Sequence, residues 1–356
     1  MTSSIASASL QDFLSRAVNR NDAPGLVACA FDRTSTFASA ASGVSSIDSE
    51  RGSMTPATLL WLASKSKTLI SLAVLKLEAD AAKAGNSVDM GALHGYNIPR
   101  VCEAGERYHY GCQGGYLALF IIRLHGKSLR RSLWDLVLSP LNVKPSTLDI
   151  YFPPPELASP SAAQVAFRSD VGSFVPPPFE FEVPMFEDEA PEGQVPLADG
   201  AFFGTLPVFA DVLRHFLLGE TPLSDKMWKE ATKDDLASRG LGVPQKPAFK
   251  SSLAPLAADV DVWAKTKEDD KVEKDDSLGW SLMQTLVHRY ETKDGHQPGT
   301  LEWAGLANTY FFIDPSSGLG GIISAQFVPF AVKEMLDLKH KFFRWVRDNA
   351  PTAAKV

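Results

Sequence analysis

The sequence of 356 residues predicts an α+β fold, an α/β sandwich in which helices flank an antiparallel sheet. Two observations support this expectation. A helix and two strands begin the chain and several strands and a helix end it, whereas the middle is mostly helical. Hydrophobic residues make up 45% of the chain and charged residues 22%, a composition typical of globular proteins with a large core. We therefore expect one sheet built from both chain ends, with a mostly helical inserted lobe.

Each element is predicted from the period of its apolar residues and from the turn residues at its ends. Apolar residues three or four positions apart predict helices over residues 9–21, 64–80, 112–125, 128–137, 209–218, 225–235 and 331–348. Alternating or continuous apolar runs predict strands over residues 26–31, 36–41, 279–288, 299–304, 308–314 and 320–327. These elements divide into a sheet lobe of residues 1–62 and 275–356 and a mainly helical lobe of residues 63–274. We expect the functional site in the cleft between the two lobes.

Charge and composition argue against several classes of function. The net charge is −7 and no basic patch stands out, so we expect no nucleic-acid partner. No apolar run reaches the length of a membrane span and the first ten residues lack a signal pattern, so we expect a cytoplasmic protein without a membrane partner. Cys29, Cys102 and Cys112 are expected to be reduced thiols. The seven histidines show no paired metal spacing, and we expect neither a metal nor another cofactor.

The most informative stretch is Ser64-Lys65-Ser66-Lys67, which opens a strongly apolar helical run. A serine and a lysine three positions apart at a helix start share one face, with Cβ atoms about 5–6 Å apart. An amine within reach of a hydroxyl is the minimum that Ser-Lys acyl transfer requires. The same residues also fit a plain helix start, with Ser64 as the N-cap and the lysines in solvent.

Two further segments add to this motif. Residues 104–112 (AGERYHYGC) include Tyr110, and residues 301–305 (LEWAG) include Trp303. Together the three segments resemble the motifs of the serine β-lactamase-like family, in its class C β-lactamase, esterase and transesterase branch. The pairing of Tyr-Gly with a Trp-type third motif is most similar to fungal polyketide-tailoring acyltransferases of the lovastatin-pathway type. The resemblance implies a β-lactamase/transpeptidase-like fold.

The resemblance also implies roles for individual residues. Ser64 would be the nucleophile, and Lys67 or Tyr110 would take its proton, with the choice between them left open. Burial against the apolar helix would lower the pKa of Lys67 and favour a neutral amine. The backbone N–H groups of Ser64 and Leu306 would form the oxyanion hole. The residues expected to bind substrate are Trp303, Ala304, Gly305, Gln113 and His109.

Departures from the family pattern refine the expected substrate. Cys112 stands where the family has an asparagine, and the third motif has no lysine or histidine. Both losses favour esters or thioesters over β-lactams and peptides. The expected reaction passes an acyl group from a thioester, on a carrier protein or coenzyme A, or from an ester to a small-molecule acceptor or water, in secondary-metabolite tailoring. Because the segment between Ser64 and Tyr110 is short for the family, a cyclase-type catalyst or a binding protein remains the alternative.

Overall fold

The computed structural model describes residues 3–47, 52–86, 110, 113–144, 147–150, 162–177, 198–200, 202–241 and 277–351. Its largest element is a seven-stranded antiparallel sheet in the order β2-β1-β12-β11-β10-β9-β8. The strands are β1 (Gly25–Asp32), β2 (Thr36–Gly43), β8 (Leu278–Trp280), β9 (Leu286–His288), β10 (Leu301–Gly305), β11 (Thr309–Asp314) and β12 (Leu319–Ser324). Strands from the two chain ends meet where β1 pairs with β12.

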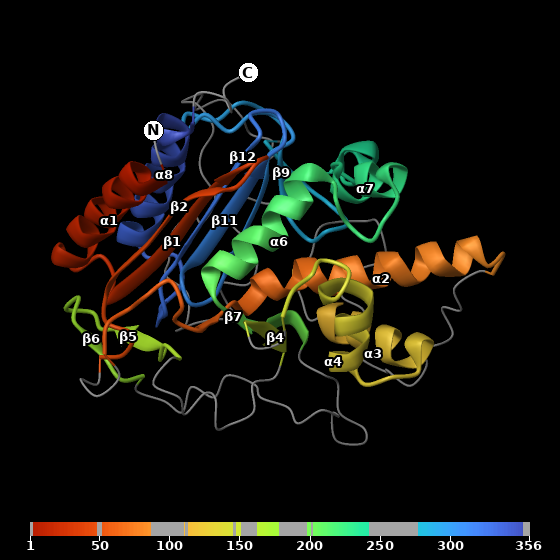
Figure 1. Cartoon of the computed structure of the whole chain (residues 1–356), viewed down its shortest axis with the longest axis horizontal. Helices are drawn as coiled ribbons and strands as arrows, with labels where there is room; N and C mark the ends of the chain where they lie inside the picture. Colours follow the sequence, from red (N-terminus) through yellow and green to blue (C-terminus); the bar gives the residue numbers. More distant parts are fainter. Residues whose placement is uncertain are drawn as a thin grey trace.

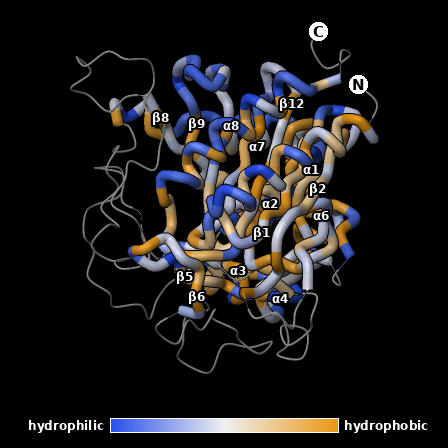
Figure 2. Tube along the Cα trace, turned by 90° about the vertical axis from the view of Figure 1, so that its left-hand side faces the viewer, coloured by the Kyte–Doolittle hydropathy of each residue, from blue (hydrophilic) through white to orange (hydrophobic). Residues whose placement is uncertain are grey.

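Helices cover both faces of this sheet. Neighbouring residues of β11 point to opposite sides of the sheet, and on each side they pack on a different helix. Phe311 packs edge-to-face on Phe209 of α6 (Leu206–Leu218), with ring centroids 6.2 Å apart. Phe312 packs on Phe343 of α8 (Lys333–Asn349) at 4.6 Å. The N-terminal helix α1 (Ser3–Asn19) lies beside α8 and packs on β2 (Figure 1). The result is a helix–sheet–helix sandwich with an apolar interior (Figure 2).

A second group of helices lies next to one end of the sheet and α6 (Figure 1). Its members are α2 (Ser66–Lys83), α3 (Gln113–His125), α4 (Leu129–Leu133) and the π-helical turn η4 (Trp134–Leu138). Ser128 caps α4 by accepting a hydrogen bond from the backbone N–H of Arg131. Helix α2 packs on α3, α4 and η4, which explains why its first two turns are buried on all sides. The long apolar run in the sequence therefore forms a central helix.

Short elements connect the sheet to these helices. One small sheet consists of β3 (Leu60–Trp61), β7 (Phe202–Gly204) and β4 (Leu148–Ile150), and another of β13 (Phe327–Val328), β5 (Ala166–Arg168) and β6 (Phe174–Val175). The remaining elements are η2 (Ala63–Lys65), η5 (Ala198–Gly200), α7 (Asp225–Thr232) and η6 (Ala237–Arg239). Strand β3 leads directly into η2 and α2, so the small sheet sets where this helix begins.

The structure confirms the predicted α+β class, with an antiparallel sheet built from both chain ends and flanked by helices. Two predicted strands were wrong in extent. Residues 279–288 form two strands, β8 and β9, because the chain turns at 281–285 with Gln284 at φ 55°. The predicted strand 320–327 ends at Ser324 in β12, and Phe327 belongs to β13 in a small sheet. The division into two lobes stays a prediction, and α6 from the middle of the chain packs on β1, β11 and β12. Within the described residues, no helix is long and apolar enough to cross a membrane.

Candidate active site

Ser64 lies in the 3-10 turn η2, immediately before α2. Ala63, the preceding residue, has φ 48°, a conformation that alanine rarely adopts. Two contacts hold this turn in place: the Ser66 hydroxyl donates to the Ala63 carbonyl at 2.6 Å, and the N–H of Phe202 in β7 donates to the Ser66 hydroxyl at 3.1 Å. The small sheet therefore fixes the backbone around Ser64, whose side chain stays partly exposed.

Lys67 and Tyr110 both reach the Ser64 hydroxyl. Lys67 Nζ donates to Ser64 Oγ at 3.2 Å, and the Tyr110 hydroxyl donates to the same oxygen at 2.9 Å. Lys67 Nζ also lies 4.9 Å from the centroid of the Tyr110 ring. The three residues that the sequence predicts as catalytic are therefore brought together, with the amine and the phenol on the same oxygen.

Asp199 completes this cluster, and the sequence prediction missed its role. Its carboxylate Oδ1 lies 3.3 Å from Lys67 Nζ, and its backbone carbonyl accepts from the same amine at 3.3 Å. The N–H of Gly114 in α3 also bonds to the carboxyl. A Cβ on Gly114 would lie 1.7 Å from Asp199 Oδ1, so the helix can approach this closely only because residue 114 is glycine. The single sequence signal is an acidic residue in a short Asp-Gly turn.

The electrostatics of Lys67 differ from the expectation. Burial by itself lowers the pKa of Lys67, but the electrostatic interactions and hydrogen bonds with Tyr110 and Asp199 outweigh burial and raise it above its ordinary value. The direction of this shift is opposite to the expected one and favours a charged Lys67. Burial raises the pKa of Asp199, and the opposing effects of Lys67 and Gly114 do not cancel it.

Lys65 points away from this cluster into the core. It is fully buried, donates to the Ser324 hydroxyl at 3.0 Å and lies over the Phe209 ring. Burial lowers its pKa well below the ordinary value. Because Lys65 and Lys67 are both buried and α2 has Lys65 as its N-cap residue, the alternative of a capping Ser64 with solvated lysines was wrong.

Trp303 holds the backbone of the candidate nucleophile. Its indole Nε1–H donates to the Ser64 carbonyl at 3.0 Å, and its ring packs edge-to-face on Trp280 at 4.7 Å and tilted against Tyr110 at 5.7 Å. Only 3% of its surface is exposed. Trp303 therefore positions Ser64, and its predicted part in substrate binding stays a prediction.

The other predicted residues lie at the end of β10, directly after it, or at the start of α3. A Cβ on Gly305 would lie 2.6 Å from the Leu62 carbonyl, so the end of β10 lies directly against η2, and Ala304 is buried there. Leu306 follows β10 and packs against the small cluster of Trp61, Ala63, Phe203 and Ala307. The predicted oxyanion hole of Ser64 and Leu306 stays a prediction. Gln113 is the first residue of α3, and His109 lies outside the described residues.

One group of potential metal ligands lies behind β10. Atoms of His288, His296 and Glu302 lie within 4.8 Å of one another, and all three residues are buried. However, Lys339 Nζ donates to Glu302 at 2.6 Å and Arg347 contacts His296 Nδ1 at 3.0 Å. Two fixed cations at the ligand atoms disfavour a metal ion, so these residues fit an internal ion-pair network better.

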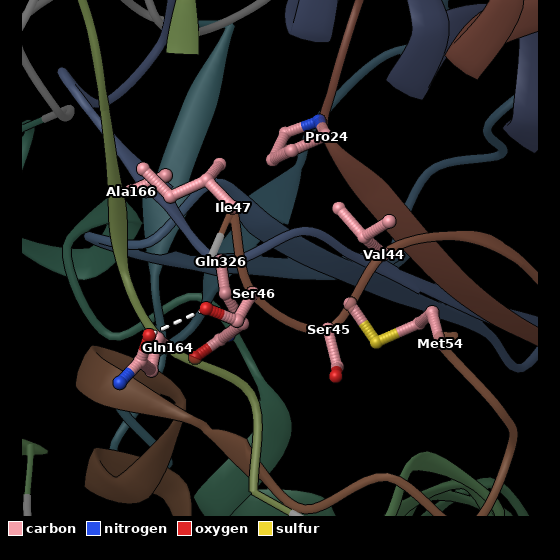
Figure 3. Close-up of a pocket in the computed structure, with 9 residues that line it drawn as sticks. All are labelled: Pro24, Val44, Ser45, Ser46, Ile47, Met54, Gln164, Ala166 and Gln326. Carbon is pink, nitrogen blue, oxygen red and sulfur yellow. Dashed lines mark hydrogen bonds between the residues drawn. The ribbon is translucent and has the colours of Figure 1, made fainter. Parts of the chain in front are cut away.

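A small hollow of about 200 Å³, including its open mouth, lies near the end of β2 (Figure 3). Ser46 donates to Gln164 at 2.5 Å on its wall, and Gln326 connects the hollow to β3 by exchanging two hydrogen bonds with the Trp61 backbone. Neither Ser64 nor Lys67 lines it. The hollow is therefore separate from the Ser64 cluster, and it is smaller than most ligand pockets.

Comparison with known proteins shows which solved structures share this fold. No protein-family model matches the sequence, and no curated protein sequence matches it. The structure is similar to simvastatin synthase (LovD) from Aspergillus terreus, with a TM-score of 0.71 and 14% identity over 98% of this chain and 99% of that one. It is also similar to EstCE1, a hydrolase with promiscuous acyltransferase activity, with a TM-score of 0.65 and 14% identity over 96% and 99% of the two chains. A β-lactamase from Mycobacterium bovis aligns with a TM-score of 0.57 and 14% identity over 96% and 99%.

The chain has the serine β-lactamase-like fold. This fold accounts for nearly the whole chain, since each of these similarities spans at least 96% of it. At 14% identity the similarity establishes the fold alone, so the chemistry must be argued from the Ser64 cluster itself.

Proposed function

We propose that this chain is a serine acyltransferase or esterase that works through an acyl-Ser64 intermediate. The observation that carries the proposal is the convergence of Lys67 Nζ and the Tyr110 hydroxyl on Ser64 Oγ, at 3.2 Å and 2.9 Å. A nucleophile within hydrogen-bond reach of a proton acceptor, which is itself oriented by a third group, is the arrangement that covalent catalysis requires. The similarity to LovD and EstCE1 supports this class of reaction.

Tyr110 is the proposed acceptor of the Ser64 proton. An ammonium cannot accept the Ser64 proton, whereas the Tyr110 oxygen lies 2.9 Å from Ser64 Oγ and is the proposed acceptor. Ser64 Oγ then attacks the acyl carbonyl while its proton passes to the Tyr110 oxygen. When the carbonyl carbon expels the thiol or alcohol, Tyr110 returns that proton to the leaving group and acyl-Ser64 remains.

The second half of the reaction repeats these steps with a new nucleophile. Tyr110 takes a proton from an acceptor alcohol or from water, the oxygen attacks acyl-Ser64, and the proton returns to Ser64. The backbone N–H groups of Ser64 and Leu306 are proposed to stabilise the oxyanion in both halves. In this proposal Lys67 keeps its proton throughout and supplies a fixed positive charge, whereas Tyr110 moves the proton.

The substrate class is part of the same proposal. Of the two lysines next to Ser64 in the sequence, Lys67 pairs with Asp199 and Lys65 donates to Ser324 in the core. A carboxylate on the substrate would thus find no available ammonium from these two lysines, which favours neutral acyl esters or thioesters. We propose a thioester donor, on a carrier protein or coenzyme A, and a small-molecule alcohol acceptor in polyketide-type tailoring.

A fluorophosphonate probe and a panel of p-nitrophenyl esters and acyl thioesters test the proposal. The wild type should be labelled at Ser64 and turn over at least one donor, and Ser64→Ala should lose both properties. Ser128→Ala, which removes a serine hydroxyl from the cap of α4, is the matched control and should keep both. Labelling or turnover that survives Ser64→Ala contradicts the mechanism and favours a cyclase-type catalyst or a binding protein on this fold.

A further inference from the structure

The carboxylate of Asp199 is a charged group that the acyl-transfer steps above do not use, although it lies in contact with Lys67. Lys67 is almost fully buried, and the exposed fraction of the Asp199 side chain is 18%. Asp199 meets Lys67 twice, through Oδ1 and through its backbone carbonyl, each at 3.3 Å. A carboxylate this close to a buried ammonium interacts with it far more strongly than an exposed ion pair does.

Among the described residues, the charged side chains of the elements packed around Lys67 pair with other groups or lie farther along their helices. Helix α3 contributes the Gly114 N–H at this point, whereas its charged residues Arg123 and His125 lie in its last turn. The α4–η4 segment also packs on α2, and its Asp135 pairs with Lys127 and Arg131. In η2, Lys65 faces Ser324 on the other side. Among the described residues, the titratable groups that act on Lys67 are therefore Tyr110 and Asp199.

We propose that Asp199 is a positioning residue that holds Lys67 in its charged form and its place, and so reserves Tyr110 as the group that moves the proton. The proposal rests on the acyl-Ser64 mechanism and deepens it. Without the carboxylate, Lys67 would lose an opposite charge and would give up its proton more easily. A neutral Lys67 would compete with Tyr110 for the Ser64 proton, because both contact Ser64 Oγ.

The first test asks whether the pair exists, and it needs no substrate. Thermal unfolding is compared for the wild type, Asp199→Asn, Lys67→Met and the double variant at pH 7. If the pair forms, each single variant lowers Tm, and the double variant loses clearly less than the sum of the two single losses. Fully additive losses overturn the proposal, whether or not the protein transfers acyl groups.

The second test asks what the pair does. The pH dependence of kcat and KM is measured for the wild type and Asp199→Asn with the best ester donor. We expect kcat at pH 7 to fall about 10- to 100-fold with little change in KM, and the alkaline limb of the profile to move to lower pH. Asp135→Asn, which breaks the Lys127 and Arg131 pairs in the α4–η4 segment, is the matched control and should leave the profile unchanged.

The outcomes separate this proposal from the one on which it rests. A lowered kcat with an unmoved alkaline limb assigns Asp199 a purely structural role and overturns the proposal, while the acyl-Ser64 mechanism stands. A wild type that turns over no donor and resists the fluorophosphonate overturns the acyl-Ser64 mechanism and, with it, the catalytic part of this proposal. The Tm comparison still decides in that case whether Asp199 and Lys67 pair.

Discussion

Replacing Lys339 by methionine removes one half of a fully buried ion pair behind the strand that carries Trp303. Lys339 Nζ donates to Glu302 Oε1 at 2.6 Å, and neither side chain is more than 3% exposed. His288 bonds to the other carboxylate oxygen at 2.9 Å. Methionine keeps the aliphatic stem but no charge, so Lys339→Met leaves the Glu302 carboxylate buried with His288 as its remaining partner.

The expected loss is large because the unpaired charge cannot reach water. Breaking a buried ion pair by removing one partner costs about 3–5 kcal/mol of unfolding free energy. The cation–π contacts of Lys339 with Tyr310 and Phe343, at 5.8 and 5.7 Å, add about 0.5–1 kcal/mol each. The volume change contributes little because the methionine side chain fills most of the same space. We therefore expect a loss of at least about 3 kcal/mol.

The loss should also depend on pH. Burial would raise the pKa of Glu302, but Lys339 and His288 outweigh it and hold the pKa well below its usual value. A carboxylate with a lowered folded pKa stabilises the protein above its unfolded pKa, and this stability disappears as the pH falls through the folded value. The difference between wild type and Lys339→Met should thus be full at neutral pH and shrink below about pH 4.

Urea unfolding followed by circular dichroism and tryptophan fluorescence measures both effects. Lys333→Met is the matched control: it lies in the same helix and pairs with Asp337, but both side chains are exposed, so we expect no measurable change. The double variant Glu302→Gln/Lys339→Met should recover much of the lost stability, since it leaves no buried charge. A loss below about 1 kcal/mol in Lys339→Met, or a loss that does not depend on pH, would refute the reasoning.

Three further predictions follow from single contacts. Lys65→Met should unfold at a higher Tm than wild type at pH 7, and this gain should shrink toward pH 10. Burial lowers the folded pKa of Lys65, so the wild type gains stability as the pH rises and its unfolded state releases the Lys65 proton. A Tm difference that does not depend on pH would contradict this. Trp303→Phe removes the donor to the Ser64 carbonyl. It should lower kcat about fivefold with little change in KM, as expected for the loss of one hydrogen bond. An unchanged kcat would show that this bond does not position the nucleophile. Burial raises the pKa of Cys29 to about 12, so iodoacetamide should modify Cys29 only after unfolding. Peptide mass spectrometry measures the modification, and rapid modification of the native protein would contradict the burial of Cys29.

The fold and the central residues of the site could be predicted from local patterns. Ser64 and Lys67 share a helix face because they are three positions apart, and the apolar run that follows predicts a buried helix. Tyr110 could be placed beside them because its segment resembles a known motif. Strand β11 could be predicted within one residue, because its apolar run is bounded by turn residues on both sides. In each case the signal lies in residues close together in the sequence.

What the sequence could not predict depends on contacts between distant residues. Asp199 reaches Lys67 from more than a hundred residues away and, together with Tyr110, reverses the direction in which burial alone shifts the pKa of Lys67. Lys65, a charged residue type, is buried in the core because its amine meets Ser324 across the fold. The turn between β8 and β9 contains neither glycine nor proline, so nothing in its composition interrupts the predicted strand.

The most direct test of the acyl-Ser64 mechanism is intact-mass spectrometry after brief incubation with acyl thioesters and p-nitrophenyl esters. The account predicts that the wild type gains the mass of one acyl group, that peptide mapping places this group on Ser64, and that Ser64→Ala gains nothing under the same conditions. Because Tyr110 is proposed to move the proton, Tyr110→Phe should form the adduct much more slowly. Turnover without any adduct, or an adduct that forms equally in Ser64→Ala, would contradict the central claim.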